Sequence, residues 1–154
     1  MQLSTKGRYA VMAMVELAKH GDAGALPLAM IADSQKISIA YLEQLFLKLR
    51  RAGLVIATRG PKGGYRLART PDEITIAEIM DAADEQVRMN RCAVEGTDWC
   101  LGTKRCMTHD LWRALGDHIG DFLVGVSLQD VLDQKFAKSA AAAGAANKDI
   151  AARS

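Results

Sequence analysis

The chain has 154 residues, the usual size of one domain, and 49% of them are hydrophobic and 25% charged. This composition excludes collagen-like, mucin-like and wholly disordered chains. No apolar run approaches the ~20 residues that span a bilayer, and the first residues contain no apolar signal core. We therefore expect a cytoplasmic protein without a membrane partner.

The net charge of +2 is unevenly distributed along the chain. Residues 1–70 hold 11 Lys and Arg against 4 Asp and Glu, a balance of +7, and residues 71–154 hold 9 against 14, a balance of −5. A basic half joined to an acidic half favours contact between the first half and a polyanion.

Three helices are predicted in the basic half. The first begins at Ser4 or Thr5 and ends near residue 20, where His-Gly stops it. The second covers about 28–34, and after a short turn Ser38 caps a third helix that runs to about residue 52. The last two form a helix-turn-helix.

A β-hairpin with a basic tip is predicted directly after these helices. Residues 54–58 form a short strand, the Gly-rich stretch 60–64 a turn, and residues 65–67 the returning strand. This order of elements is that of a winged helix-turn-helix, in which one helix enters the major groove and the hairpin touches the backbone or minor groove. The predicted fold class is mainly α with a small β-hairpin wing, and residues 1–70 are predicted to form the DNA-binding domain.

The acidic half contains further helices and a segment without periodicity. A capping box at 75–78 opens a linking helix within residues 71–90, residues 91–109 are predicted as a cluster-binding loop, and the Ala-rich residues 137–154 as a disordered tail. Residues 110–136 are predicted as a long dimerisation helix and a short final helix. The apolar seam expected between two copies comprises Leu111, Trp112, Leu115, Ile119, Phe122, Leu123 and Val126.

The three cysteines, Cys92, Cys100 and Cys106, lie within 15 residues of one another. Thiolates are soft ligands for zinc or iron-sulfur clusters, and the wide single spacings favour a cluster over a zinc ribbon. A cluster generally takes four protein ligands, and His109 is the candidate for the fourth. Two alternatives are a zinc-stabilised DNA-binding module and a thiol redox enzyme. A thiol redox enzyme usually has a Cys-x-x-Cys pair, which this sequence lacks, so we expect no catalytic activity.

The candidate base-reading residues lie near the start of the third helix. Ser38, Glu43 and Gln44 are placed there, and Gln suits adenine whereas Glu accepts from cytosine or repels phosphate. Arg59 beside the hairpin is suited to a narrow minor groove. The expected phosphate partners are Lys6, Arg8, Lys48, Arg50, Arg51 and Lys62.

Several motifs closely resemble the IscR family of iron-sulfur cluster regulators. They are LSTKGRYA at 3–10, ISIAYLEQLF at 37–46, RGPKGGY at 59–65 and CMTHDLW at 106–112. The resemblance covers about residues 1–135. It implies a homodimeric winged-helix transcription factor on double-stranded, pseudo-palindromic operators.

The resemblance also implies a cofactor and a task. The cofactor is an iron-sulfur cluster, typically 2Fe-2S, on Cys92, Cys100, Cys106 and His109, supplied by the iron-sulfur assembly machinery. The task is repression, and at some promoters activation, of the genes for cluster assembly, with cluster occupancy changing promoter choice. Glu43 would then discriminate between promoter classes.

Two positions depart from the pattern of that family. Seven residues separate Cys92 from Cys100, a spacing that resembles the rhizobial iron regulators of the RirA type, which are associated with a 4Fe-4S cluster and global iron-responsive repression. Ala40 stands where a hydroxyl residue is expected, so one DNA contact would be absent.

Overall fold

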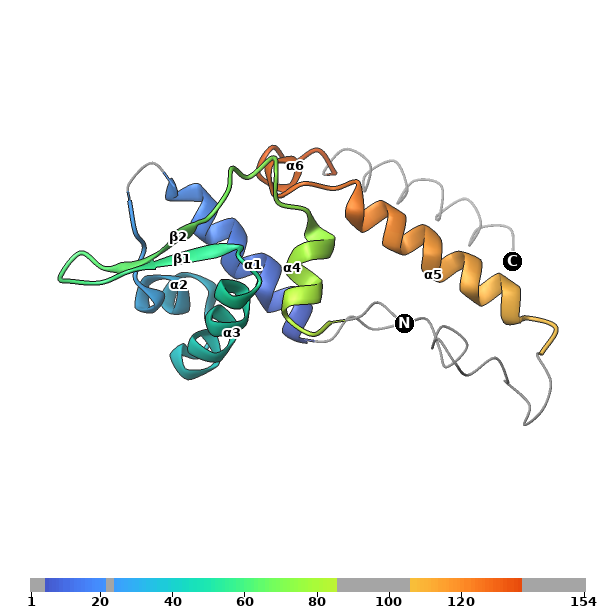
Figure 1. Cartoon of the computed structure of the whole chain (residues 1–154), viewed down its shortest axis with the longest axis horizontal. Coiled ribbons are helices and arrows are strands. Elements are labelled where there is room, and N and C mark those ends of the chain that lie inside the picture. Colours follow the sequence, from blue (N-terminus) through green and yellow to red (C-terminus); the bar gives the residue numbers. More distant parts are fainter. Residues whose placement is uncertain (1–4, 22–23, 86–105, 137–154) are drawn as a thin grey trace, which may run out of the picture.

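The structure, a computed structural model, describes residues 5–21, 24–85 and 106–136. Its elements are α1 (Thr5–Lys19), α2 (Leu28–Gln35), α3 (Ile39–Arg51), β1 (Val55–Thr58), β2 (Gly64–Leu67), α4 (Ile76–Ala82), α5 (His109–Val124) and α6 (Leu128–Leu132). Figure 1 shows α2, α3 and the β1–β2 hairpin grouped at one end of the molecule, with α5 extending from the other. The predicted fold class, mainly α with a small β-hairpin, is confirmed.

The helix-turn-helix is built by local signals at the start of each helix and in the turn. Pro27 occupies the N-cap of α2, and Lys36 ends that helix in the left-handed region at φ 55°. Buried Ile37 holds the turn against the core. Ser38 then caps α3, because its Oγ accepts a hydrogen bond from the Tyr41 backbone N–H at 3.3 Å.

The wing is an antiparallel hairpin in which Val55 pairs with Leu67 and Thr58 with Gly64. A third stretch of chain joins it: Leu26 and Tyr65 exchange backbone hydrogen bonds of 2.8 and 2.9 Å. A Cβ built on Gly64 would lie 2.4 Å from the backbone of Leu26, so only glycine permits this close approach.

One hydrophobic core holds the domain together, and it extends past residue 70. Ile74 and Ile79 from the α4 region and Leu128 from α6 are fully buried together with Met14 of α1 and Phe46 of α3. Both later helices pack on α1. Helices α4 and α6 therefore belong to the winged-helix domain, because they bury apolar residues of α1 that α2 and α3 do not cover.

Two helix starts far apart in sequence are joined by a short antiparallel bridge between Thr75 and Ser127. The Ile76 N–H donates to the Val126 carbonyl at 2.9 Å, and the Leu128 N–H donates to the Ile74 carbonyl at 2.8 Å. Val126 is only 7% exposed as a result. Its expected place in the dimer seam is corrected: Val126 packs in the core of its own chain.

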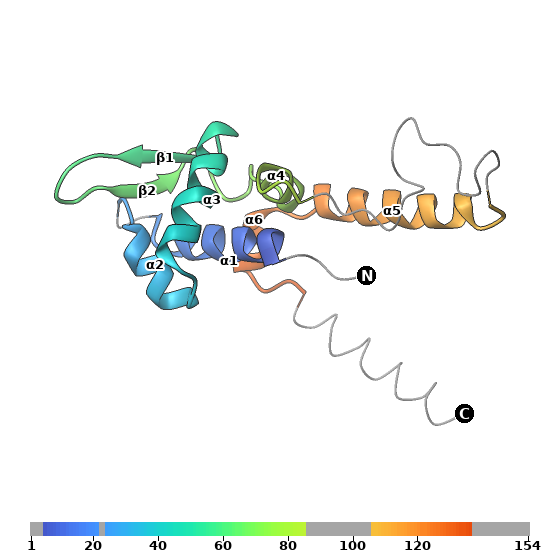
Figure 2. The same ribbon diagram turned by 90° about the horizontal axis from the view of Figure 1, so that it is seen from below.

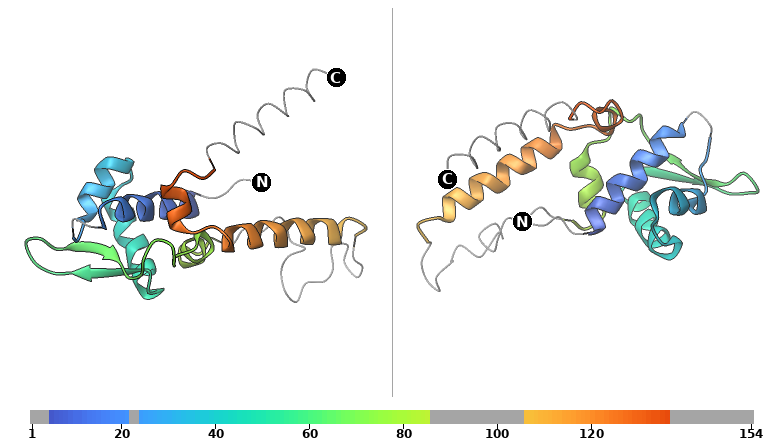
Figure 3. Two further views of the ribbon diagram at one scale, coloured as in Figure 1. Left: turned by 90° about the horizontal axis from the view of Figure 1, so that it is seen from above. Right: turned by 180° about the vertical axis from the view of Figure 1, so that it is seen from behind.

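Helix α5 extends away from the rest of the described structure in every view (Figures 2 and 3). It contacts α4 and continues into the bridge that leads to α6. Of the predicted loop over 91–109, only residues 106–109 fall within the described ranges, and the predicted tail over 137–154 lies outside them.

Candidate nucleic-acid interface and metal site

The third helix presents two contrasting faces. Leu42, Leu45, Phe46 and Leu49 are buried on one face, as the 3.6-residue period requires. The predicted base-reading residues Glu43 and Gln44 lie on the opposite, exposed face. Ser38 is exposed at the N-cap, directly before the helix, where its hydroxyl caps the first turn. These side chains are therefore displayed together at the start of α3.

The basic residues predicted to contact phosphate, and Arg59, predicted to enter the minor groove, lie around this helix at several places. Arg50 and Arg51 are exposed in its last turn, Lys6 and Arg8 are exposed in the first turn of α1, and Arg59 and Lys62 are exposed in the turn that joins β1 to β2. Figure 2 shows α3 and the hairpin side by side. The predicted DNA-contacting groups thus come from three elements of one domain.

Lys48, in the second half of α3, forms an ion pair with an acidic residue outside that helix. Its Nζ lies 2.5 Å from the Asp84 carboxylate, which follows α4 and adopts φ 56°. The hydrogen bond and charge of Lys48 lower the pKa of Asp84. Sequence reasoning missed Asp84, since 36 residues separate the partners and no local pattern marks them.

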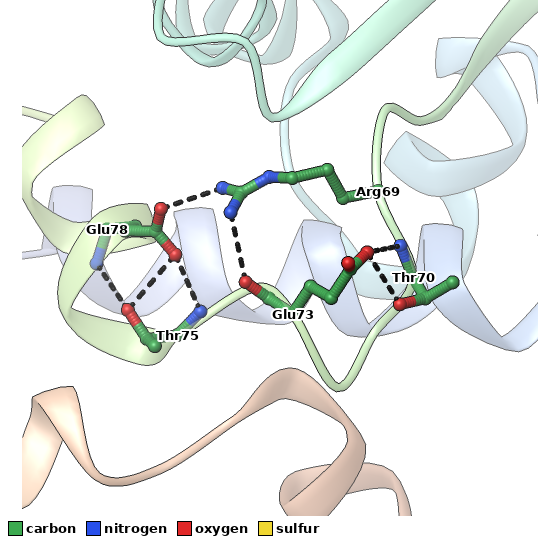
Figure 4. Close-up of polar contacts among 5 residues, drawn as sticks. All are labelled: Arg69, Thr70, Glu73, Thr75 and Glu78. Atoms are coloured by element: carbon green, nitrogen blue, oxygen red, sulfur yellow. Dashed lines mark hydrogen bonds and ion pairs between the residues drawn. The ribbon is translucent and has the colours of Figure 1, made fainter.

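A second basic residue, Arg69, is held by the start of α4 (Figure 4). Its guanidinium donates to the Glu78 carboxylate at 2.7 Å and to the Glu73 carbonyl at 3.0 Å. Burial raises the pKa of Glu78, but hydrogen bonds from the Thr75 backbone N–H and from Arg69 together outweigh it, so the pKa is lowered. Arg69 therefore fastens the segment after the wing to α4.

The two predicted metal ligands within the described residues lie together at the start of α5. The His109 backbone N–H donates to the Cys106 carbonyl at 3.0 Å, and the Cys106 Sγ lies 3.5 Å from the Thr108 hydroxyl. His109 is 2% exposed, whereas Cys106 is half-buried. Cys92 and Cys100 lie outside the described residues. Within those residues, no three metal-binding side chains come together.

Helix α5 carries an exposed apolar face. Leu111, Trp112, Leu115 and Phe122 are exposed, Leu111 by 60%, and Ile119 is half-buried. Leu123 differs, since it packs against the core. Phe136, which the sequence reasoning did not select, meets the Phe122 ring edge-on at 5.8 Å between centroids. Patches of this kind mark an interaction surface.

Comparison with known proteins identifies the family. Residues 3–134 match the Rrf2 family, described as iron-dependent transcriptional regulators. The chain belongs to the Rrf2 family. Rrf2 proteins of this description bind DNA and regulate transcription, and the exposed face of α3 beside a basic hairpin is consistent with that activity.

Individual relatives and solved structures support this family assignment. The HTH-type transcriptional regulator IscR of Aliivibrio salmonicida is 51% identical over 132 residues, which cover 86% of this chain and 77% of that protein. The solved T. potens IscR is 36% identical with a TM-score of 0.71, covering 88% of each chain. The global cysteine regulator CymR of B. subtilis is 35% identical with a TM-score of 0.74, covering 87% of this chain and 98% of that one.

These Rrf2 relatives are transcriptional regulators rather than enzymes. Across the part of the chain that the structure describes, every helix is too short or too polar to cross a membrane.

Proposed function

We propose that this Rrf2 protein senses an iron-sulfur cluster and controls the genes of cluster assembly, as a repressor that also activates some promoters. The observation that carries the proposal is the position of Cys106 three residues before buried His109 at the start of α5, where the His109 backbone N–H donates to the Cys106 carbonyl. The IscR name of its relatives and the iron-dependent description of the family support it.

The donor set suits an iron-sulfur cluster. Cys106 offers a soft thiolate, and three residues on, His109 offers an imidazole from the same turn of chain. Cys92 and Cys100 would complete a set of three thiolates and one imidazole. When bound, such a cluster supplies a redox-sensitive and oxygen-sensitive centre, and a histidine ligand raises its potential relative to four thiolates.

The residues around the two ends of the cysteine segment offer a route from ligation to DNA binding. At one end, Asp84 holds Lys48 of α3. At the other, His109 opens α5, whose far end is fastened to the core through the Thr75–Ser127 bridge. A cluster bound by Cys92, Cys100, Cys106 and His109 would tie residues 92–109 together. It would thereby link the Asp84 end, which contacts α3, to the start of α5. A coupling of roughly 5- to 150-fold in DNA affinity needs only about 1 to 3 kcal/mol.

One observation favours a second candidate, a global iron-responsive repressor of the RirA type. Seven residues lie between Cys92 and Cys100, which resembles that branch and its 4Fe-4S cluster. The two candidates have the same fold, the same cluster ligands and DNA as the binding partner. They differ in cluster type and in the promoters that respond.

Anaerobic purification followed by ultraviolet-visible and Mössbauer spectroscopy, with iron and sulfide counted per protomer, tests the proposal. A 2Fe-2S spectrum supports the assembly regulator, and a 4Fe-4S spectrum supports the iron-responsive candidate. We expect Cys92→Ala to abolish the cluster and leave a folded dimer. Absence of iron and sulfide after anaerobic reconstitution would contradict both candidates.

Histidine ligation is tested by His109→Ala against His118→Ala, which removes an exposed imidazole from the same helix. We expect only the first to change the spectrum. Apo and cluster-loaded protein that bound every promoter fragment with equal affinity would refute sensing while leaving DNA binding intact.

A further inference from the structure

The exposed face of α3 contains apolar side chains that the fold does not bury. Ile39, at the first position of the helix, is 47% exposed, and Leu47, two turns later, is 40% exposed. Ala40 is exposed beside Ile39. Ile39 and Ala40 are adjacent at the start of the helix, where an apolar contact with a bound partner would remove their surface from water.

The helical period places these residues among the predicted base readers. Ala40 lies one turn before Gln44, and Ile39 lies one turn before Glu43, so each apolar side chain neighbours a polar one on the helix surface. The Ser38 cap fixes the first turn that carries Ile39 and Ala40. The backbone positions of both residues are therefore set before any ligand binds.

We infer that Ile39 and Ala40 read thymine through its C5-methyl group in the major groove. Residues near the start of a recognition helix reach base edges, and the thymine methyl is the apolar feature that this groove displays. Adenine N6 and N7 lie on the same edge of an A·T pair, where Gln bonds them bidentately. Gln44 and Ala40, one turn apart, would thus read the two bases of A·T-containing steps together.

The surroundings favour DNA over a protein as the occupant of this apolar face. The helix also exposes Arg50 and Arg51, and the exposed Lys62 lies in the wing beside it. Residues 1–70 carry a balance of +7, from 11 basic and 4 acidic residues. This positive charge attracts a polyanion such as DNA. Methyl groups in the DNA major groove would then contact Ile39 and Ala40.

The test compares duplexes with and without thymine methyl groups. The full-length protein, with its cluster, first selects a duplex from a random pool, and its affinity is then measured by fluorescence anisotropy for that duplex and for one with deoxyuridine in place of each thymidine. We expect about 4-fold weaker binding for each contacted methyl that is removed. Ile39→Ala and Ala40→Ser should each reduce this thymidine-to-deoxyuridine ratio.

Met30→Ala is the matched control, because Met30 is an exposed apolar residue of α2, outside the recognition helix. It should keep the wild-type ratio. Equal affinity of the wild type for both duplexes, or variants that retain the full ratio, would overturn the inference. The inference rests on the proposed use of α3 as the recognition helix, and that premise fails separately if Gln44→Ala binds both duplexes as tightly as the wild type.

Discussion

At the scale of single residues, the contact between Lys48 and Asp84 joins α3 to the end of α4. The Lys48 Nζ and the Asp84 carboxylate are 2.5 Å apart, and both side chains are partly exposed to solvent. An exposed ion pair adds little to stability. The ion pair matters instead for DNA binding, because Lys48 is less available to contact a phosphate while it is paired with Asp84.

We expect Asp84→Asn to raise DNA affinity and to make it more sensitive to salt. The freed lysine would neutralise one more phosphate, so the slope of log affinity against log salt should steepen by about 0.9 for each copy that gains the contact. Fluorescence anisotropy over a series of potassium chloride concentrations measures this slope.

Asp72→Asn is the control, because it removes the same charge at an exposed site outside α3 and α4. It should raise affinity slightly through net charge and leave the slope nearly unchanged. If the slope of Asp84→Asn equals that of the control, Lys48 already contacts phosphate in the wild type.

At the scale of elements, α4 and α6 each begin with a capping box, and the two boxes adjoin at the Thr75–Ser127 bridge. In the second box, Asp130 accepts from the Ser127 backbone N–H at 2.9 Å and is also bonded by Lys135. The hydrogen bond from Lys135, then those from Ser127, lower the pKa of Asp130 from 3.8 to about 2. Short helices such as α6 depend on such ends.

The lowered pKa predicts how stability responds to acid. A carboxyl group whose folded pKa lies below its unfolded value stabilises the fold above the unfolded pKa and loses this effect as pH falls through the folded one. The wild type should therefore be more stable than Asp130→Asn by a constant free energy of unfolding above pH 3.8. This difference should shrink as the pH falls from 3.8 to about 2. Urea unfolding followed by circular dichroism measures it.

Lys135→Met isolates the cause of that shift. In its background, Asp130→Asn should show a weaker acid dependence, because the hydrogen bond that lowers the Asp130 pKa most is absent. An unchanged dependence would mean that Ser127 alone holds the carboxylate.

At the scale of the whole molecule, α5 has an apolar face that the other described residues leave largely exposed. Leu111, Trp112, Leu115 and Phe122 are exposed along it. A second copy of the chain would cover this face by an isologous contact, as two-fold symmetric dimers do. Such a dimer would also present two copies of α3 to two half-sites of a pseudo-palindromic operator.

We expect Leu115→Asp to convert a dimer into a monomer and to weaken operator binding strongly, because a buried, unpaired carboxylate opposes association. Sedimentation equilibrium measures the mass. Arg113→Asp, on the opposite side of α5, should remain dimeric. A dimeric Leu115→Asp protein would move the interface elsewhere.

Features that depend on neighbours in sequence were predictable. The cap at Ser38, the capping box at 75–78 and the buried stripe of α3 follow from propensity and period, and the Gly-rich turn at 60–64 follows from backbone freedom. The charge asymmetry and the family motifs indicated DNA binding. The cysteine ligand set stays a prediction, because two of its members lie outside the described residues.

Features that depend on contacts between distant residues were decided by the tertiary structure. Leu26 pairs with Tyr65, Lys48 with Asp84, and Thr75 with Ser127. Period alone placed Val126 on the seam of α5, yet the bridge turns it into the core. A helical pattern identifies which side chains must be buried, but the identity of the surface that buries them is set by how the whole chain packs.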